Sequence, residues 1–252
     1  MESLINNEYF EAAKGDQIAV ITFKAKIFDL ITSLEDSQML MEFLRKTEQA
    51  KEVKGLLFVN RPGCLGEEAY DGFLQKILNK ERLSEELESE AIAEHTMRFR
   101  QLNMLKRFVK YLANYQKLFF AGLNCQIVTP FIGAVMVADF RFASRNASFS
   151  FAHIRYGLHP SGGLPFFMTH YLGYAKAIDI QLSESISAEE AYSIGLINRI
   201  LPEENFEANC IRAIKPYLNF SRPTLRLTKQ LNAFAFHQLD HYFDFESGLL
   251  NL

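Results

Sequence analysis

The sequence predicts an α/β fold in which helices cover a mainly parallel sheet. Residues 18–23 and 55–59 are short runs of apolar and β-branched side chains, typical of strands that are buried on both faces. Residues 37–47 lie between them and carry apolar side chains at helical spacing, namely Met39, Leu40, Phe43 and Leu44. A strand, helix, strand unit of this kind favours a parallel sheet.

Size and charge bound the class of protein. The chain has 252 residues, of which 48% are hydrophobic and 23% charged, so we expect one large globular domain with a small appendage. The 27 basic residues nearly balance the 30 acidic ones, which leaves a net charge of -3. No overall basicity therefore points to a nucleic acid or an anionic membrane as partner.

The cysteines and the lengths of the apolar runs indicate the cellular compartment of the protein. Cys64, Cys125 and Cys210 are far apart in the sequence, an odd number that fits neither a disulfide framework nor a metal site. The first 15 residues lack an apolar run, and the stretch 131–138 is far shorter than the ~20 residues that span a bilayer. We expect a cytoplasmic protein with reduced thiols, no metal and no membrane contact.

The middle of the chain predicts an insert followed by a helix and a strand. Charged residues dominate 78–90, and we interpret 78–98 as a mobile or solvent-facing insert. A long amphipathic helix is then expected to end near Asn114, on the apolar positions Phe99, Leu102, Leu105, Val109 and Leu112. A strand at 118–122 follows.

The second half predicts further strands and a helical end. Strands are expected at 140–143 and 148–151, and Ser187 with Glu190 forms a capping-box pattern that starts a helix ending near Gly195. The chain is expected to be helical again after Pro202. A terminal helix is predicted at 224–236, with the apolar residues Leu225, Leu227, Leu231 and Phe234.

A series of motifs between residues 119 and 202 has an order and spacing typical of one family. The motifs lie at 119–124, 138–144, 147–151, 156–163, 171–177 and 186–202. Each motif is weak alone, but their order and gap-free spacing over about a hundred residues are hard to produce by chance. The series resembles the crotonase, or enoyl-CoA hydratase/isomerase, superfamily, of which this chain looks like a divergent member.

The resemblance implies a fold, a ligand and an assembly. It implies a crotonase-like ββα spiral (ClpP/crotonase-type) over residues 1–200 and a C-terminal helical segment over 201–252 that helps the protein to trimerise. The implied ligand is an acyl-CoA thioester, with no other cofactor, and the implied assembly is a homotrimer or a dimer of trimers. In the family, two backbone N–H groups stabilise the thioester oxygen as it becomes an enolate.

Several positions depart from the hydratase pattern. Counted from Asn124, one oxyanion N–H would belong to Pro130 and one catalytic glutamate would stand at Gly133, while the second glutamate matches His153. Proline has no N–H to donate, and glycine has no acid or base. The other oxyanion donor matches Gly66 or Glu67. Because hydration normally uses both carboxylates, we do not expect standard hydratase activity.

Other residues are candidates for chemistry or ligand binding. His153, His159, Ser161 and Tyr156 are the candidate catalytic residues, and each has an alternative role in packing or in turn hydrogen bonds. Lys24 and Lys26 match the loop that contacts CoA in the family, so they either bind phosphate or are solvated surface lysines.

Two hypotheses about function remain open at this point. The chain is either an acyl-CoA isomerase, lyase or decarboxylase that uses His153 or the 159–161 loop, or a catalytically silent homologue that serves as a binding or partner subunit. Because fold alone does not decide activity, the geometry of the site must discriminate between them.

Overall fold

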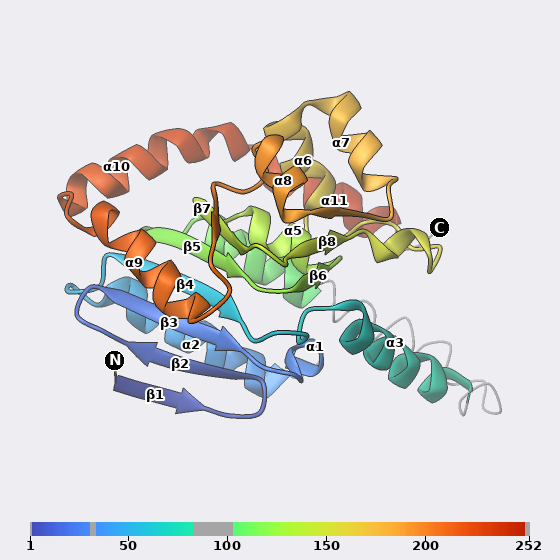
Figure 1. Ribbon diagram of the computed structural model, residues 1–252, viewed down its shortest axis with the longest axis horizontal. Coiled ribbons are helices and arrows are strands. Elements are labelled where there is room, and N and C mark those ends of the chain that lie inside the picture. Colours follow the sequence, from blue (N-terminus) through green and yellow to red (C-terminus); the bar gives the residue numbers. More distant parts are fainter. Residues whose placement is uncertain (1, 31–33, 83–102, 250–252) are drawn as a thin grey trace.

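The computed structural model describes residues 2–30, 34–82 and 103–249, which form two sheets surrounded by helices (Figure 1). The larger sheet has seven strands in the order β1-β2-β3-β4-β5-β7-β10, and the smaller has three in the order β6-β8-β9. This arrangement confirms the predicted α/β class.

The strands of the larger sheet include those predicted from apolar runs. They are β1 (Glu2–Asn6), β2 (Phe10–Lys14), β3 (Ile18–Phe23), β4 (Gly55–Asn60), β5 (Leu118–Leu123), β7 (Phe140–Ser144) and β10 (Arg199–Leu201). β3, β4, β5, β7 and β10 pair in parallel, whereas β1 and β2 extend the sheet as an antiparallel edge. The sequence did not predict this edge hairpin, since its half-exposed strands lack a long apolar run.

The smaller sheet joins three short segments from the second half of the chain. β6 (Gln126–Val128) and β8 (Ser148–Ser150) pair in parallel, and β9 (Ser185–Ser187) is antiparallel to β8. β6 follows β5 after only two residues, so the chain passes directly from one sheet to the other at Asn124 and Cys125. This crossing positions the loop that the motif spacing associates with the oxyanion hole.

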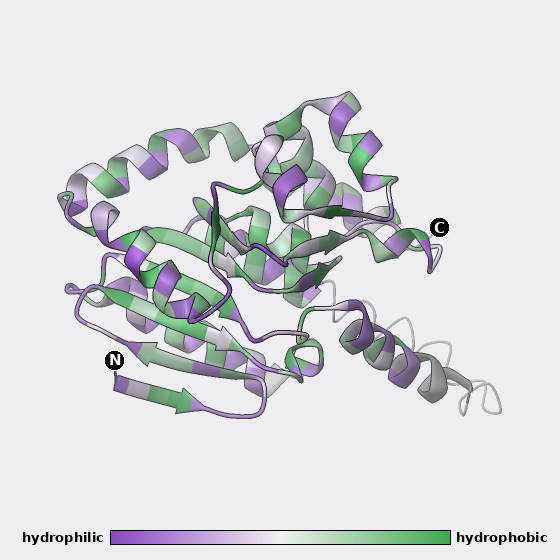
Figure 2. Ribbon diagram, viewed as in Figure 1, coloured by the Kyte–Doolittle hydropathy of each residue, from purple (hydrophilic) through white to green (hydrophobic). Residues whose placement is uncertain are grey.

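Helices cover both faces of the seven-stranded sheet. The remaining elements are α1 (Ile27–Leu30), α2 (Leu34–Gln49), α3 (Glu67–Arg82), α5 (Phe131–Met136), η1 (Ala152–Ile154), α6 (Leu164–Leu172), α7 (Tyr174–Gln181), α8 (Ala188–Ser193), α9 (Phe206–Leu218), α10 (Arg222–Ala233), η2 (Phe234–Phe236) and α11 (Leu239–Gly248). Figure 2 shows mainly hydrophobic residues in the central strands, whereas hydrophilic and hydrophobic residues alternate along the surrounding helices. Among the described residues, no helix is both long enough and apolar enough to cross a membrane.

One face of this sheet packs mainly against α9, and Leu225 of α10 also contacts it. Phe206, Cys210, Ile214 and Leu218 are buried in one cluster with residues of β3, β4, β5 and β7. The opposite face packs against α2 and the helical residues 103–113 in a larger apolar cluster. Because both faces of the sheet are covered by helices, the central strands are apolar at nearly every position.

Before the C-terminal segment, the predicted helices agree with the structure except where they meet the insert. The capping box at Ser187 is formed, since the Ser187 hydroxyl accepts from the Glu190 N–H and the Glu190 carboxylate accepts from the Ser187 N–H. Residues 78–82 of the predicted insert are the last residues of α3. The remainder, 83–98, lies outside the described residues.

The C-terminal segment contains several helices where a single terminal helix was predicted at 224–236. α10 ends at Ala233 and a 3₁₀ turn follows, after which α11 returns toward the core and buries Leu239, Phe243 and Glu246. The apolar residues predicted for the terminal helix stay at the surface, with Leu227, Leu231 and Phe234 being 50%, 77% and 75% exposed. No residue of α10 is buried.

A partly buried ion pair attaches α10 to the sheet. Lys229 Nζ donates to Asp139 Oδ2 at 2.8 Å and to the carbonyl of Lys117 at 2.9 Å, and Asp139 also accepts from the Phe119 N–H. The Lys229 side chain is only 7% exposed. Since α10 has no fully buried residue, this polar contact and the packing of Leu225 link the helix to the sheet.

We expect Lys229→Met to loosen α10, because the substitution leaves Asp139 without its cation. Breaking a pair of this kind costs about 1–3 kcal/mol. Hydrogen exchange followed by mass spectrometry should show faster exchange across 222–233 and unchanged exchange in β5. The exposed Lys176→Met is the control, and equal exchange in the two variants would contradict the assignment.

Candidate functional site

The loops that follow β4 and β5 meet at the carboxyl ends of these parallel strands. Asn60 Nδ2 donates to the Asn124 carbonyl, and the Asn124 N–H donates to Asn60 Oδ1, each at 2.8 Å. The Val128 N–H then donates to the Leu65 carbonyl at 2.8 Å. The structure therefore brings together the two loops that contain the predicted oxyanion residues.

The candidate oxyanion donors have acceptors inside the chain. The Gly66 N–H donates to the Gly63 carbonyl at 3.2 Å, and the Glu67 N–H donates to Gln126 Oε1 at 2.9 Å. Pro130 has no N–H. A thioester oxygen in this region would have to compete with acceptors that are already well placed.

Glu67 belongs to a polar network at the start of α3. Its carboxylate accepts hydrogen bonds from Gln126 Nε2, Ser150 Oγ and Arg155 Nη2, the last of which is also an ion pair. The guanidinium of Arg155 balances the charge of Glu67. The network thus connects α3 to the three-stranded sheet.

Pro130 is the N-cap residue of α5, and Phe131 is the first residue of this helix. The Pro130 carbonyl accepts from the Ala134 N–H, as in a first helical turn. The Phe131 ring is buried and lies 5.0 Å from the Phe28 ring and 6.2 Å from the Phe23 ring, measured between centroids. Phe131 therefore occupies space at the inner wall of the candidate site.

Gly133 faces the backbone of the turn at residues 161–163. A Cβ atom at Gly133 would lie 2.6 Å from the Ser161 carbonyl oxygen and 2.7 Å from the Gly162 carbonyl oxygen. Both separations are shorter than real Cβ contacts. No side chain fits at Gly133 unless the turn moves away.

The same turn binds a carboxylate from the C-terminal helix. Gly162 and Gly163 have φ angles of +72° and +76°, and their N–H groups donate to the two oxygens of Glu246 at 3.2 and 3.3 Å. Burial raises the pKa of Glu246, and the Tyr242 hydroxyl interacts with it. Sequence reasoning missed Glu246, because no local pattern relates it to a turn 83 residues earlier.

The two candidate histidines lie near this turn in different surroundings. His153 is buried in η1 with Nδ1 3.3 Å from Thr129 Oγ1, and burial, followed by the proximity of His159, lowers its pKa. His159 Nδ1 lies 2.9 Å from the Pro160 carbonyl. His159 Nε2 is buried and has no hydrogen-bond partner in the described part of the chain.

Tyr156 and Ser161 have contacts within the chain. The Tyr156 ring packs edge-on against Tyr70 at 5.8 Å, and Arg155 lies over its face at 5.7 Å. The Ser161 carbonyl is one of the two oxygens that face Gly133, and it also accepts from the Leu164 N–H.

Lys24 and Lys26 bind the connection between β1 and β2. Lys24 Nζ donates to the Asn6 side chain and to the Asn7 carbonyl, and Lys26 Nζ pairs with Glu8 at 2.5 Å. Both cations are therefore engaged by the edge hairpin.

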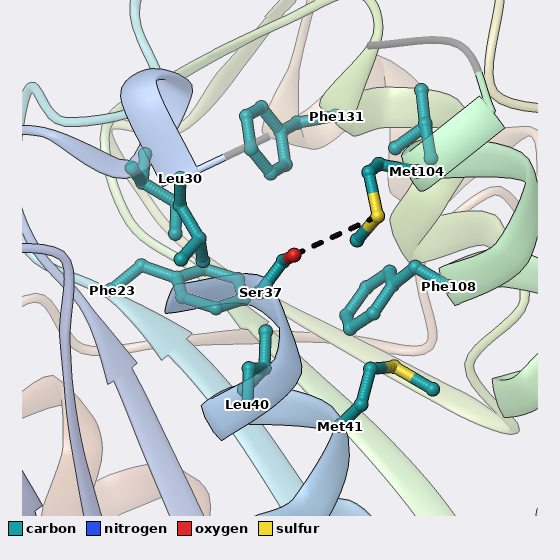
Figure 3. Close-up of a pocket in the computed structure, with 10 residues that line it drawn as sticks. Phe23, Leu30, Ser37, Leu40, Met41, Met104, Phe108 and Phe131 are labelled. Carbon is teal, nitrogen blue, oxygen red and sulfur yellow. Dashed lines mark hydrogen bonds between the residues drawn. The ribbon is translucent and has the colours of Figure 1, made fainter. Parts of the chain in front are cut away.

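A small apolar cavity lies beside Phe131 (Figure 3). Its volume is about 40 Å³, and α1, α2, α5 and the helical residues 103–113 enclose it. It is lined by Phe23, Ile27, Leu30, Ser37, Leu40, Met41, Met104, Leu105, Phe108 and Phe131. The lining is suited to a hydrocarbon group and offers one hydroxyl, that of Ser37, which contacts Met104 Sδ at 3.7 Å.

The three thiols are free and differ in their surroundings. Burial raises the pKa of Cys64 and of Cys210 to about 12, whereas Cys125 is half-buried in the loop after β5. A raised pKa disfavours the nucleophilic thiolate.

Within the described residues, no group of three His, Cys, Asp or Glu side chains is placed to bind a metal ion.

Comparisons with known proteins agree with this architecture. Residues 81–251 match the enoyl-CoA hydratase/isomerase family. No curated protein matches the chain significantly.

Solved structures with the same fold are distant in sequence. An enoyl-CoA hydratase from Mycobacterium avium subsp. paratuberculosis K-10 has a TM-score of 0.73 at 18% identity, with coverage of 98% of this chain and 95% of that one. An enoyl-CoA hydratase/isomerase from Cupriavidus metallidurans CH34 also gives 0.73, at 19% identity with 98% and 89% coverage. A probable enoyl-CoA hydratase/isomerase from Mycobacterium abscessus gives 0.68, at 21% identity with 96% and 89% coverage.

The fold, the motif order and the family match over two thirds of the sequence agree with one another. The chain belongs to the enoyl-CoA hydratase/isomerase family of the crotonase superfamily.

Proposed function

We propose that this chain binds an acyl-CoA thioester without hydrating an enoyl group. The observation that carries the proposal is the state of the candidate oxyanion donors. The Gly66 and Glu67 N–H groups donate to acceptors within the chain, and Pro130 has none to offer. Loss of a single oxyanion donor costs an enzyme about 10²–10³ in rate, so loss of the set is severe.

The acid-base positions support the same conclusion. The turn at 161–163 leaves no room for a carboxylate at Gly133. His153 contacts Thr129 and has a lowered pKa, which favours its neutral form. A neutral imidazole that is held by a hydroxyl is a poor substitute for two carboxylates that position and deprotonate one water molecule.

The apolar cavity supports retained binding of the acyl group. It lies directly beside Phe131, next to the loops where the family places the thioester. Its small volume of about 40 Å³ suits a short hydrocarbon chain rather than a long one. Burial of each CH₂ group there would contribute about 0.8 kcal/mol to binding.

A second function, that of a partner subunit, is favoured by the C-terminal surface. Leu231 of α10 and Phe234 of the 3₁₀ turn η2 are more than two thirds exposed. We propose that the protein self-associates as a homotrimer or a dimer of trimers. We also propose that it is cytoplasmic, because its three cysteines are free.

The first test measures binding and turnover on the same sample. We expect calorimetry with crotonyl-CoA to detect binding and a hydration assay to show no rate above that of the solution without protein. Hydration at a typical enzyme rate of about 1–10³ s⁻¹ would contradict the proposal. Absence of binding at millimolar ligand would leave the partner-subunit function in its place.

The second test fills the cavity. Leu40→Phe adds volume to a lining residue, so we expect the affinity for crotonyl-CoA to fall by about tenfold or more, since overpacking a filled site costs about 1–3 kcal/mol. The control is Leu182→Phe, the same substitution at a residue that is 70% exposed. Equal affinities in the two variants would place the acyl group elsewhere.

The third test addresses the crowded glycine. Gly133→Ala places a Cβ against two carbonyl oxygens, and we expect it to lower the free energy of unfolding by about 1–3 kcal/mol. Gly72→Ala is the matched control, because nothing lies within 4 Å of a Cβ at that position in α3. There the same change should stabilise the protein by about 0.5–1 kcal/mol. Urea unfolding of both variants checks the difference.

A further inference from the structure

A basic cavity lies at the amino ends of the parallel strands, opposite the loops described above. The end of α2, the residues that precede β4 and β5, and the first turns of α10 form its walls. Figure 1 shows the start of α10 at the same side of the molecule as the amino ends of β4 and β5. Its volume of about 310 Å³ is within the roughly 300–1,000 Å³ range of small-molecule sites.

Positive charge dominates the lining of this cavity. Five basic side chains line it, namely Lys51, Lys54, Lys117, Arg222 and Arg226. Among the residues that the structure describes, none of the five has a carboxylate oxygen within 4 Å. The positive charges in the lining therefore have no ion-pair partner among the described residues.

The one acidic residue in the lining is already engaged. Glu48 Oε2 accepts from the Tyr111 hydroxyl and Glu48 Oε1 accepts from the Gln116 N–H, both at 2.7 Å. Lys117 Nζ instead donates to the carbonyl oxygens of Thr47 and Ala50 at 2.5 Å each. Carbonyl oxygens fix the ammonium group but do not neutralise it.

The surroundings of Lys117 disfavour the charged form of its ammonium group. Burial, followed by repulsion from Arg222, lowers the pKa of Lys117 to about 8, although Glu52 and Glu48 oppose the change. Lys14 adds further repulsion. An anion in the cavity would relieve this repulsion, because it would place negative charge between the cations.

The N-terminus of α10 adds to the positive potential at the rim. Ser221 caps the helix, with its Oγ accepting from the Thr224 N–H at 3.3 Å, and Arg222 and Pro223 form the first turn. The positive end of the helix dipole favours anions at this end of α10. The dipole and the side-chain charges therefore act in the same direction.

We propose that this cavity binds a small ligand with two or more phosphate charges, at a site separate from the acyl cavity. The arginine guanidinium groups match phosphate oxygens in pairs, and the lysines add point charges around them. The parallel strands between the two sites have six residues, which corresponds to about 20 Å. The inference does not depend on the proposed acyl-CoA binding.

The test is a calorimetric titration of inorganic pyrophosphate into the full chain. Wild-type protein is expected to bind, and the double variant Arg222→Glu/Arg226→Glu is expected to bind about tenfold or more weakly. Both side chains are exposed, and a glutamate at residue 222 suits the first turn of a helix, so the fold is expected to persist. Thermal unfolding followed by circular dichroism checks this.

The matched control reverses two cations elsewhere. Arg145→Glu/Lys176→Glu changes the net charge by the same amount at exposed residues outside the cavity, and its affinity for pyrophosphate should equal that of the wild type. No binding to the wild type at millimolar pyrophosphate, or an equal loss in both double variants, would overturn the inference.

A crotonyl-CoA titration of the same variants separates the two proposals. The part of pyrophosphate binding that Arg222→Glu/Arg226→Glu loses, and that the control variant keeps, reports on the basic cavity. The affinity of Arg222→Glu/Arg226→Glu for crotonyl-CoA should equal that of the wild type. A parallel loss of both ligands would overturn the assignment of a separate site.

Discussion

The contact between Gly133 and the turn at 161–163 is the constraint on which the arrangement of the site depends. α5 approaches so closely that a Cβ atom at Gly133 would clash with two carbonyl oxygens of the turn. On the same turn, the N–H groups of Gly162 and Gly163 donate to Glu246 of α11. The turn therefore relates α5, α6 and α11 to one another, and glycine at residue 133 permits the approach of α5.

The close packing at Gly133 also shapes the region around the candidate site. The space that a side chain would need at Gly133 is filled by main chain, and the N–H groups of Gly66 and Glu67 stabilise the neighbouring loops. The Glu67 network with Gln126, Ser150 and Arg155 strengthens the same region. Groups at the carboxyl ends of β4 and β5 thus contribute to folding stability.

The sequence predicted the parts of the structure that depend on local patterns. β3, β4 and β5 are buried on both faces and so are apolar throughout, and Ser187 and Glu190 cap a helix through their own backbone. The match of Pro130 to an oxyanion donor and of Gly133 to a catalytic glutamate rests on motif spacing and stays a prediction.

The sequence did not predict contacts between residues that are far apart in the chain. Glu246 meets its partners more than 80 residues away. The break between α10 and α11 depends on where α11 packs. Lys24 and Lys26 pair with an edge hairpin whose strands have no clear alternation.

The unequal burial of the three thiols has a practical consequence. Cys64 and Cys210 are protonated at neutral pH and enclosed by apolar side chains, whereas Cys125 reaches solvent in the loop that joins the two sheets. A maleimide dye will therefore label the native protein at Cys125 alone, without any engineered cysteine. The label will stand next to Asn124, where its fluorescence reports directly on events in the loops at the ends of β4 and β5.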